Sequence, residues 1–187
     1  QMTMLHLMQG WRTDKLLYSK KALAEIATGT YGFMNPRKSL YDAFVAAEGA
    51  DGYRLNSTMR TFDQMKEYGI DIQPGAFVYG NEGYFMWKNR PLKEDCIIDQ
   101  PFFQGLQYIN FRVMRYAEVL LMAAEANLKV GNEAKALLYV NLVRARAKLT
   151  ALTTLTLQDI KNEKRLELCL ESVRYQDLVR WGDAKDA

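Results

Sequence analysis

Three carboxylates at helical spacing are the strongest sign of chemistry in the sequence. Glu163, Glu167 and Glu171 stand four residues apart, so a helix would place them on one face. A carboxylate metal site of the helical-bundle type would also need Glu-x-x-His pairs from other helices, and the one histidine, His6, has no acidic partner at that spacing. We therefore predict a structural ion-pair network rather than a metal site. The candidate basic partners nearby in the sequence are Arg165, Arg174 and Arg180.

Nucleophilic and phosphate chemistry have less support. A serine or cysteine nucleophile normally needs a base such as histidine, and His6 has no Gly-x-Ser-x-Gly or similar motif to serve. Gly75, Gly80 and Gly83 lack the Walker and dinucleotide spacings, so we interpret them as turn residues. These patterns favour neither an enzyme nor a cofactor site.

Aromatic and polar side chains are interleaved between residues 79 and 90. The apolar C–H face of a pyranose ring packs on a flat aromatic ring, while its hydroxyls need amide, carboxylate or guanidinium partners. This segment therefore predicts a carbohydrate-binding loop. Aromatics also fill small satellite cores, and packing is the favoured interpretation for Trp87 taken alone. The candidate ligand-binding residues are Tyr79, Asn81, Tyr84, Trp87 and Arg90.

A loop-rich segment must position these side chains. Between residues 53 and 107 helical periodicity is lost, and glycine, proline and aromatic residues accumulate, which predicts loops with short strands near 85–87 and 111–113. Before this segment, apolar spacing predicts helical pieces from Met4 to Trp11 and around Leu23 to Ala27. Another short helix is expected with Ser39 as its cap and an end near Gly49.

The last third of the chain predicts three helices. The clearest runs from Arg112 to Val130, and a second, capped by Asn132, repeats the same apolar spacing as far as Ala147. The short connection makes the pair an antiparallel hairpin of the tetratricopeptide type. A third helical stretch follows the capping signature of Thr156 and Asp159 and ends at Gly182.

The composition is that of an ordinary globular chain. Its 187 residues are 49% hydrophobic and 25% charged, enough apolar side chains for the core of one domain. The net charge of +3 is spread along the chain without a basic stripe, so nucleic acid is not an expected partner. No apolar run approaches the roughly 18 residues of a membrane-spanning helix. Cys96 and Cys169 are expected to be buried free thiols rather than a disulfide.

Three segments, in order, resemble motifs of the SusD/RagB family. Residues 110–126 read NFRVMRYAEVLLMAAEA and are similar to the family's N-x-x-x-x-R-Y-A-E-x-L-L-M-x-A-E-A. Residues 136–147 resemble its A-x-x-x-x-N-x-V-R-x-R-A helix, and residues 160–182 resemble its ending in R-W-G. Lys164 and Ser172 depart from the usual arginine and glycine. The resemblance extends from about residue 18 onward.

The resemblance implies an all-α, SusD-like fold: a tetratricopeptide-type helical hairpin and a loop-rich region with minor short strands. Residues 1–187 would form a C-terminal region of a longer protein, with a helical scaffold at 1–50 and 110–187 and a ligand-facing, loop-rich region at 51–109. The side chains expected in structural ion pairs of the scaffold are Glu118, Glu125, Arg144, Arg146, Arg174 and Asp177.

The resemblance also implies a function without catalysis or cofactor. Such a protein is a lipoprotein on the extracellular face of the outer membrane, held by an N-terminal lipid anchor outside this chain, and it lies as a lid on a SusC-like TonB-dependent transporter. Its ligand is expected to be a glycan, which the aromatic loop favours. Two alternatives stay open: capture of peptides, which would favour a wide polar cleft, and a helical scaffold module without its own ligand.

Overall fold

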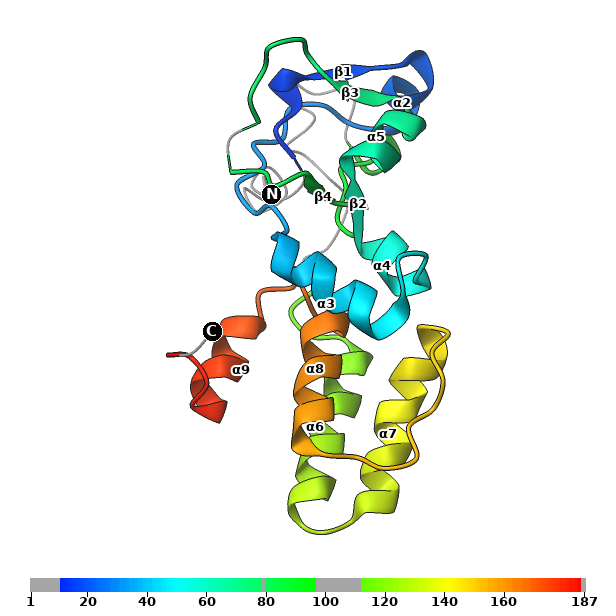
Figure 1. Cartoon of the computed structure of the whole chain (residues 1–187), viewed down its shortest axis with the longest axis vertical. Helices are drawn as coiled ribbons and strands as arrows, with labels where there is room; N and C mark the ends of the chain where they lie inside the picture. The colour runs from blue at the N-terminus through cyan, green and yellow to red at the C-terminus, as the bar shows by residue number, and fades with distance from the viewer. Residues whose placement is uncertain (1–10, 79, 97–111, 186–187) are drawn as a thin grey trace. The chain divides into compact units, whose positions relative to one another are not determined.

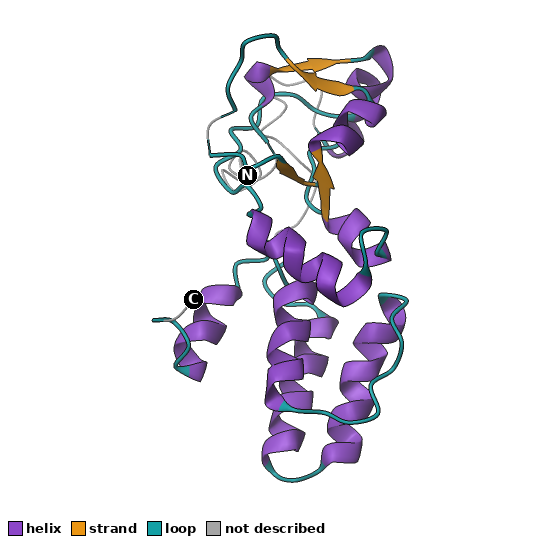
Figure 2. Ribbon diagram, viewed as in Figure 1, coloured by secondary structure: helices purple, strands orange, loops and turns teal. Residues whose placement is uncertain are grey.

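The computed structural model describes residues 11–78, 80–96 and 112–185, which belong to two compact units, Gln1–Phe111 and Arg112–Ala187. The second unit is mostly helical, whereas the first combines short helices and loops with the short strands described (Figure 1, Figure 2). The predicted all-α, SusD-like class with minor strands is confirmed. No helix in the described ranges combines the length and apolar character that a membrane span requires.

Two small antiparallel ladders organise the first unit. After the 3-10 turn η1 (Thr13–Lys15), β1 (Leu16–Tyr18) pairs with β3 (Ile70–Ile72). The second ladder joins β2 (Met59–Thr61) to β4 (Tyr84–Met86). The strand expected at 85–87 is therefore present, shifted by one residue. Phe111 lies outside the described residues, and Val113 is not in a strand.

Helices with specific caps connect these strands. Helix α2 (Lys20–Glu25) overlaps the predicted helix but ends before Ile26 and Ala27; it begins at Ser19, whose hydroxyl accepts a hydrogen bond from the Ala22 N–H. Helix α5 (Phe62–Tyr68) begins with a capping box of Thr61 and Gln64 and ends at Gly69, with φ of 106°. A Cβ on Gly69 would lie 2.2 Å from the Ser19 oxygen, so only glycine fits there.

Two further helices, α3 (Lys38–Glu48) and α4 (Tyr53–Thr58), and the 3-10 turn η2 (Lys93–Asp95) complete the first unit. The prediction that Ser39 caps a helix is wrong, because Ser39 lies inside α3 and Arg37 is the cap residue. The predicted end at Gly49 is correct. The helix predicted from Met4 to Trp11 falls mostly outside the described residues, and Trp11 itself is not helical.

The second unit contains the predicted helical hairpin. Helix α6 (Tyr116–Lys129) packs against α7 (Glu133–Arg146), and the Asn132 side chain accepts a hydrogen bond from the Lys135 N–H, as expected of a cap. Residues 112–115 are not helical, because Arg115 is extended and serves as the cap residue of α6. The buried residues of the core are Leu120, Leu121, Ala124, Ala136, Val140, Val143, Leu155 and Ile160.

The single third helix predicted after Thr156 is wrong, because the structure has two. Helix α8 (Leu157–Glu167) begins at the predicted capping box, and α9 (Arg174–Trp181) ends at Gly182, with φ of 80°. Between them Leu170 and Ser172 have φ of 63° and 65°, in the left-handed region that no continuous right-handed helix accommodates. The serine that replaces the glycine of the family motif therefore has a backbone conformation that favours glycine.

The three spaced glutamates form the predicted ion-pair network. The Arg115 guanidinium donates to Glu167 Oε1 at 2.7 Å and to Glu171 Oε2 at 2.6 Å. Arg144 donates to Glu163 at 3.0 Å, and Arg146 also contacts Glu167. Arg180, expected here from its position in sequence, belongs to a different cluster. The partners instead come from the start of α6 and from α7, because those positions face α8 in three dimensions.

A second ion cluster attaches α9 to its neighbours. Arg180 donates two hydrogen bonds to the Glu125 carboxylate at 2.7 and 2.6 Å and a third to Asp177 at 2.8 Å. The buried Lys164 also donates to Asp177, at 2.9 Å. Four of the six expected ion-pair residues are thus observed in pairs. The other two, Glu118 and Arg174, have no ion-pair partner in the described ranges.

Replacing Ser172 by glycine is expected to stabilise the protein. A non-glycine residue in the left-handed region destabilises the folded state by on the order of 1–3 kcal/mol. Glycine removes this strain, but its greater conformational freedom in the unfolded chain offsets part of the stabilisation. Ser172→Gly should therefore raise the free energy of unfolding by about 1 kcal/mol in urea titrations. Ser172→Ala is the control, because alanine keeps the strain; an equal gain from alanine would contradict the explanation.

Replacing Glu125 by glutamine is expected to cost stability in a pH-dependent way. The hydrogen bonds from Arg180, assisted by Lys129 and Trp181, lower the pKa of Glu125 to about 2. The stabilisation is therefore fully present above the unfolded pKa of about 4.3 and is lost as the pH falls toward 2. At pH 7, Glu125→Gln should lower the unfolding free energy by roughly 2–3 kcal/mol.

Urea titrations at a series of pH values test this expectation. The difference between the wild type and Glu125→Gln should shrink steadily below pH 4. Glu133→Gln, at an exposed position of α7, should show no comparable loss. A difference that stays constant between pH 7 and pH 2.5 would rule out the ionic origin.

Candidate functional site

Two loops of the first unit, residues 29–37 and 77–84, are joined by side-chain hydrogen bonds; we call them the paired loops. Asn35 links them, because its Nδ2 donates to the Gly32 carbonyl at 2.9 Å and its Oδ1 accepts from Asn81 Nδ2 at 3.3 Å. The ring of Tyr84, where the second loop enters β4, stacks on Tyr41 of α3 with centroids 4.7 Å apart. The two loops are therefore positioned together.

Asn81 fixes the shape of the second loop. Its Oδ1 accepts from the N–H groups of Gly83 and Tyr84 at 2.6 and 3.1 Å. Its Nδ2 donates to the Tyr84 carbonyl at 3.0 Å as well as to Asn35. An asparagine amide has two donors and two acceptor sites, and all four are used here. In this arrangement Asn81 supports the loop from within and has little capacity left for a ligand.

Glu82 connects the second loop to the start of α3. Its carboxylate accepts from the Lys38 N–H at 2.7 Å and from Arg37 Nη1 at 2.6 Å. The hydrogen bond from the Lys38 backbone, with help from Arg37, holds the pKa of Glu82 below its usual range. A carboxylate at the amino end of a helix also interacts favourably with the helix dipole. Glu82 thus supplies the cap that no side chain of α3 provides.

The first loop is anchored to the core at two points. The Thr30 hydroxyl donates to the Trp11 carbonyl at 2.5 Å. Gly32, with φ of 62°, lies so close to the backbone of Trp11 and Arg12 that an added Cβ would be 2.3 Å from the Arg12 nitrogen. Both the left-handed conformation and the close approach require glycine. The loop therefore has a defined position before any ligand arrives.

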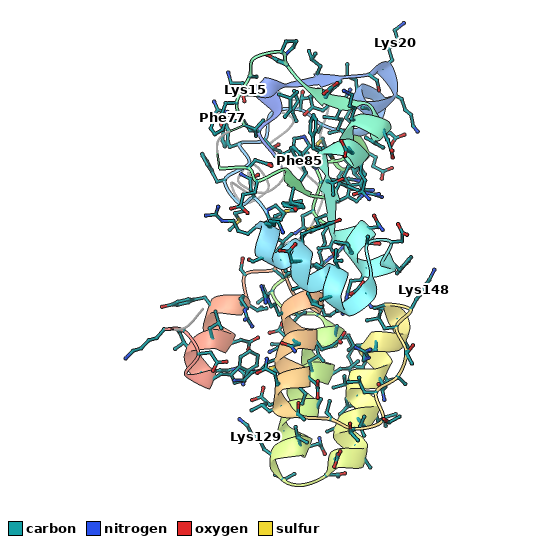
Figure 3. The ribbon with its side chains drawn as sticks, in the orientation of Figure 1. Lys15, Lys20, Phe77, Phe85, Lys129 and Lys148 are labelled. Carbon is teal, nitrogen blue, oxygen red and sulfur yellow. The ribbon has the colours of Figure 1, made fainter. Side chains whose placement is uncertain are left out.

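Large aromatic rings are exposed on the paired loops. The exposed fraction is 49% for Tyr31, 70% for Phe33 and 73% for Phe77, and the rings of Tyr31 and Phe33 lie 5.8 Å apart. Figure 3 shows Phe77 at the edge of the first unit, whereas Phe85 of β4 lies inside it. Rings held open to solvent on fixed loops are suited to contact with a ligand. We refer to Tyr31, Phe33, Phe77 and the stacked pair Tyr41 and Tyr84 as the aromatic surface.

Trp87 lies in the core instead of on a surface. Only 8% of it is exposed; its ring stacks on Trp11 with centroids 6.0 Å apart and meets the edge of Tyr68 at 5.0 Å. The same core contains the buried residues Leu16, Ala22, Ile26, Met65, Ile70, Val78 and Phe85. Its position matches the packing role that the sequence favoured for this residue.

The remaining candidates are placed differently. Tyr84 is half-buried and belongs to the aromatic surface. Arg90 is half-buried, and its guanidinium lies 4.7 Å from the Trp87 ring centroid. Tyr79 lies outside the described residues. The structure thus brings Asn81 and Tyr84 together in one loop, and places Trp87 in the core with the half-buried Arg90 against its ring; ligand contact by any of the five stays a prediction.

Sequence reasoning did not identify Tyr31, Phe33, Tyr41 or Phe77 as site candidates. The available signal was the run Tyr31-Gly32-Phe33, in which two large rings flank a glycine. The pairing of this run with residues 77–84 depends on hydrogen bonds across more than forty residues, and no local pattern encodes it.

The sequence of this chain is similar to the SusD family and to two SusD-like proteins. Residues 103–187 match the model of the SusD family. A SusD-like protein of Bacteroides ovatus is 29% identical over 174 residues, which are 91% of this chain and 32% of that protein. SusD-like protein P38 of Formosa agariphila is 34% identical over 88 residues, 40% of this chain and 18% of its own length.

Solved structures share the fold of nearly the whole chain. A laminarin-binding SusD-like protein has a TM-score of 0.78 and 28% identity, over 97% of this chain and 37% of that one. Surface glycan-binding protein A from Bacteroides thetaiotaomicron, in complex with laminarihexaose, has a TM-score of 0.72 and 25% identity over the same shares. The chain spans about a third of the length of these relatives.

Truncation of Trp87 is expected to unfold the first unit rather than remove a ligand contact. Loss of a buried tryptophan side chain costs roughly 3–5 kcal/mol, so Trp87→Ala should lower the unfolding free energy by that amount. Phe77→Ala is the matched control, because its ring is exposed and should change stability by less than about 0.5 kcal/mol. Calorimetric melting of both variants decides; equal losses would contradict the assignment of Trp87 to the core.

Proposed function

This chain belongs to the SusD family, and from that premise we propose that it is part of a cell-surface protein that binds an oligosaccharide. The proposed protein is held at the extracellular face of the outer membrane by a lipid anchor outside this chain. It passes its ligand to a SusC-like TonB-dependent transporter. No catalytic step is part of this proposal, since the relatives are named as binding proteins.

The aromatic surface is the observation that carries the proposal. Its exposed rings offer flat apolar faces on which the C–H face of a pyranose packs, and the loops are fixed before binding by Asn35, Asn81 and Glu82. Preorganised loops lose little conformational freedom when a ligand binds, which favours affinity. Phe33 and Phe77 are the most exposed of the described aromatic residues in the paired loops, and we assign them to direct contact.

The names of two solved relatives support an oligosaccharide as the ligand class. One is described as laminarin-binding, and the other was solved with laminarihexaose. Laminari-oligosaccharides are therefore the first ligands to offer.

The helical second unit is proposed as scaffold or partner surface. Tyr116 and Val119 lie three residues apart on one face of α6, and Val130 follows the helix as its C-cap residue; all three are exposed. Apolar side chains left exposed on a helix face are suited to packing against further protein. This surface is the one we assign to contact with the rest of the protein or with the transporter.

Isothermal titration calorimetry of the natural protein that carries this chain tests the ligand assignment. We expect saturable binding of laminari-oligosaccharides, and each of Phe33→Ala and Phe77→Ala should weaken it by roughly 1 kcal/mol, about fivefold. Tyr175→Ala, an equally exposed aromatic in α9, should leave the affinity unchanged.

Other outcomes would redirect the proposal. Binding of a peptide digest instead of any glycan would favour a peptide-capture subunit. No binding of either ligand would favour a helical scaffold module. Glycan binding that survives both phenylalanine substitutions would place the site elsewhere in the protein.

A further inference from the structure

Two arginine side chains approach the same indole ring in the first unit. The guanidinium carbon of Arg60, in β2, lies 5.2 Å from the Trp87 ring centroid, and that of Arg90 lies 4.7 Å from it. Cations at these distances from a tryptophan ring are attracted by its electron-rich face. Two half-buried guanidinium groups from different parts of the chain thus lie within 5.2 Å of the centroid of one buried indole.

The backbone around Trp87 fixes this arrangement. The β2–β4 ladder sets Arg60 opposite Phe85, and the Trp87 N–H donates to the Thr58 carbonyl at 2.8 Å. The chain then turns, so that the Arg90 N–H and Nη1 both donate to the Trp87 carbonyl, at 3.3 and 3.2 Å. The ladder and the turn therefore fix the backbone from which both guanidinium groups extend, and the Arg90 group is itself hydrogen-bonded to the turn.

Their charges lack an acidic partner within the described ranges. Arg12, Arg37 and Arg54 of the same unit each pair with a carboxylate, whereas neither Arg60 nor Arg90 has an ion pair there. Burial, and then the charge of Arg90, lower the pKa of Arg60, as expected for like charges brought together.

The charged side chains described beside Tyr68 do not neutralise the positive charges of Arg60 and Arg90. Tyr68, whose ring meets Trp87, donates its hydroxyl hydrogen bond to the exposed Glu25 carboxylate. Lys21 lies 5.8 Å from the Tyr68 ring centroid and adds a further positive charge. Of the charged groups just named around Trp87 and Tyr68, three are cationic and one is a carboxylate that already accepts a hydrogen bond.

We propose that Arg60 and Arg90 bind an oxyanion group carried by the ligand, a uronate carboxylate or a sulfate ester of an acidic oligosaccharide. A guanidinium offers five N–H donors in a planar fork that matches such groups, and Arg90 uses only one of its side-chain donors on Trp87. An anion between the two would remove their mutual repulsion and add charge-assisted hydrogen bonds. Trp87 acts as the platform that positions both arginines and does not itself contact the ligand.

This inference rests on the proposed oligosaccharide-binding function and names a class of ligand for it. The test is calorimetry of the natural protein with three matched probes: a neutral laminari-oligosaccharide, an oligogalacturonide with its carboxylates, and a sulfated oligosaccharide of similar length. At least one acidic probe should bind, and its affinity should fall as salt is raised from 0.05 to about 0.5 M. Which acidic probe binds distinguishes carboxylate from sulfate.

Substitution then assigns the binding to these side chains. Arg60→Gln and Arg90→Gln should each weaken the acidic probe at least about tenfold and leave any neutral-probe affinity unchanged. Arg12→Gln, which removes an exposed arginine already paired with Asp14, is the control and should have no effect. Should either glutamine variant melt well below the wild type, Arg60→Lys and Arg90→Lys replace it; they keep the charge but lose the fork, and a weaker acidic-probe affinity is still expected.

The outcomes separate this inference from the proposed function. Binding of the neutral probe alone would overturn the oxyanion site and leave the proposed function standing. Acidic-probe binding that survives substitution of both arginines in folded protein would also overturn it. Failure of all three probes would overturn both.

Discussion

The stack of Trp11 on Trp87 is the contact on which the rest of the first unit depends. It joins the start of the described chain to the residue that follows β4, and the core forms around it. The Trp11 backbone holds the first paired loop through Thr30 and Gly32. The Trp87 ring holds the two arginines. Because the first paired loop and the two arginines are both attached to this one pair of rings, loss of either ring would disturb the aromatic surface and the positions of Arg60 and Arg90 together. The two buried rings would thus influence ligand binding indirectly, through the first paired loop and the two arginines that they position.

Buried ions join the helices of the second unit. Arg115 donates to the carboxylates of Glu167 and Glu171 and also to the Glu167 carbonyl at 2.5 Å, so one guanidinium closes the end of α8 against the start of α6. Arg180 does the same between α9 and α6 through Glu125. Replacing one member would leave a buried charge without its partner, which is far more costly than losing a surface pair. The four-residue spacing of the glutamates, which is unfavourable in an isolated helix, is compensated by arginines from neighbouring segments.

Features that depend on residues close together in the sequence were predictable from it, whereas features that depend on distant residues were not. The caps at Asn132 and at Thr156 with Asp159, and the end of the helices at Gly49 and Gly182, depend on residues three or four apart and were predicted correctly. The break between α8 and α9 was missed because Leu170 and Ser172 are not residues that signal a left-handed backbone. The ladders joining β1 to β3 and β2 to β4 are only three residues long and pair segments far apart in the sequence. Strands this short show no clear alternation of apolar and polar residues from which they could be predicted. In the candidate site, Asn81 and Tyr84 lie in one loop, and their contacts with residues 29–41 have no local signal in the sequence.

The aromatic residues show most clearly why composition alone could not define the site. Tyr84, Phe85 and Trp87 are neighbours in sequence, yet alternation along β4 turns Phe85 into the core while Tyr84 meets Tyr41. Phe33 and Phe77 come from loops with no strand to turn them inward, and both stay exposed. Burial therefore divides the aromatic residues into two groups: buried rings fix the geometry, and the exposed rings are the ones proposed to contact a ligand. The arginines divide in the same way. Arg37 and Arg54 pair with carboxylates and stabilise the fold, whereas Arg60 and Arg90 contact the Trp87 ring and are the two that we propose to bind an anion. The ligand specificity of this region therefore depends on which aromatic and arginine side chains remain available for contact with a ligand, and not only on which residue types are present.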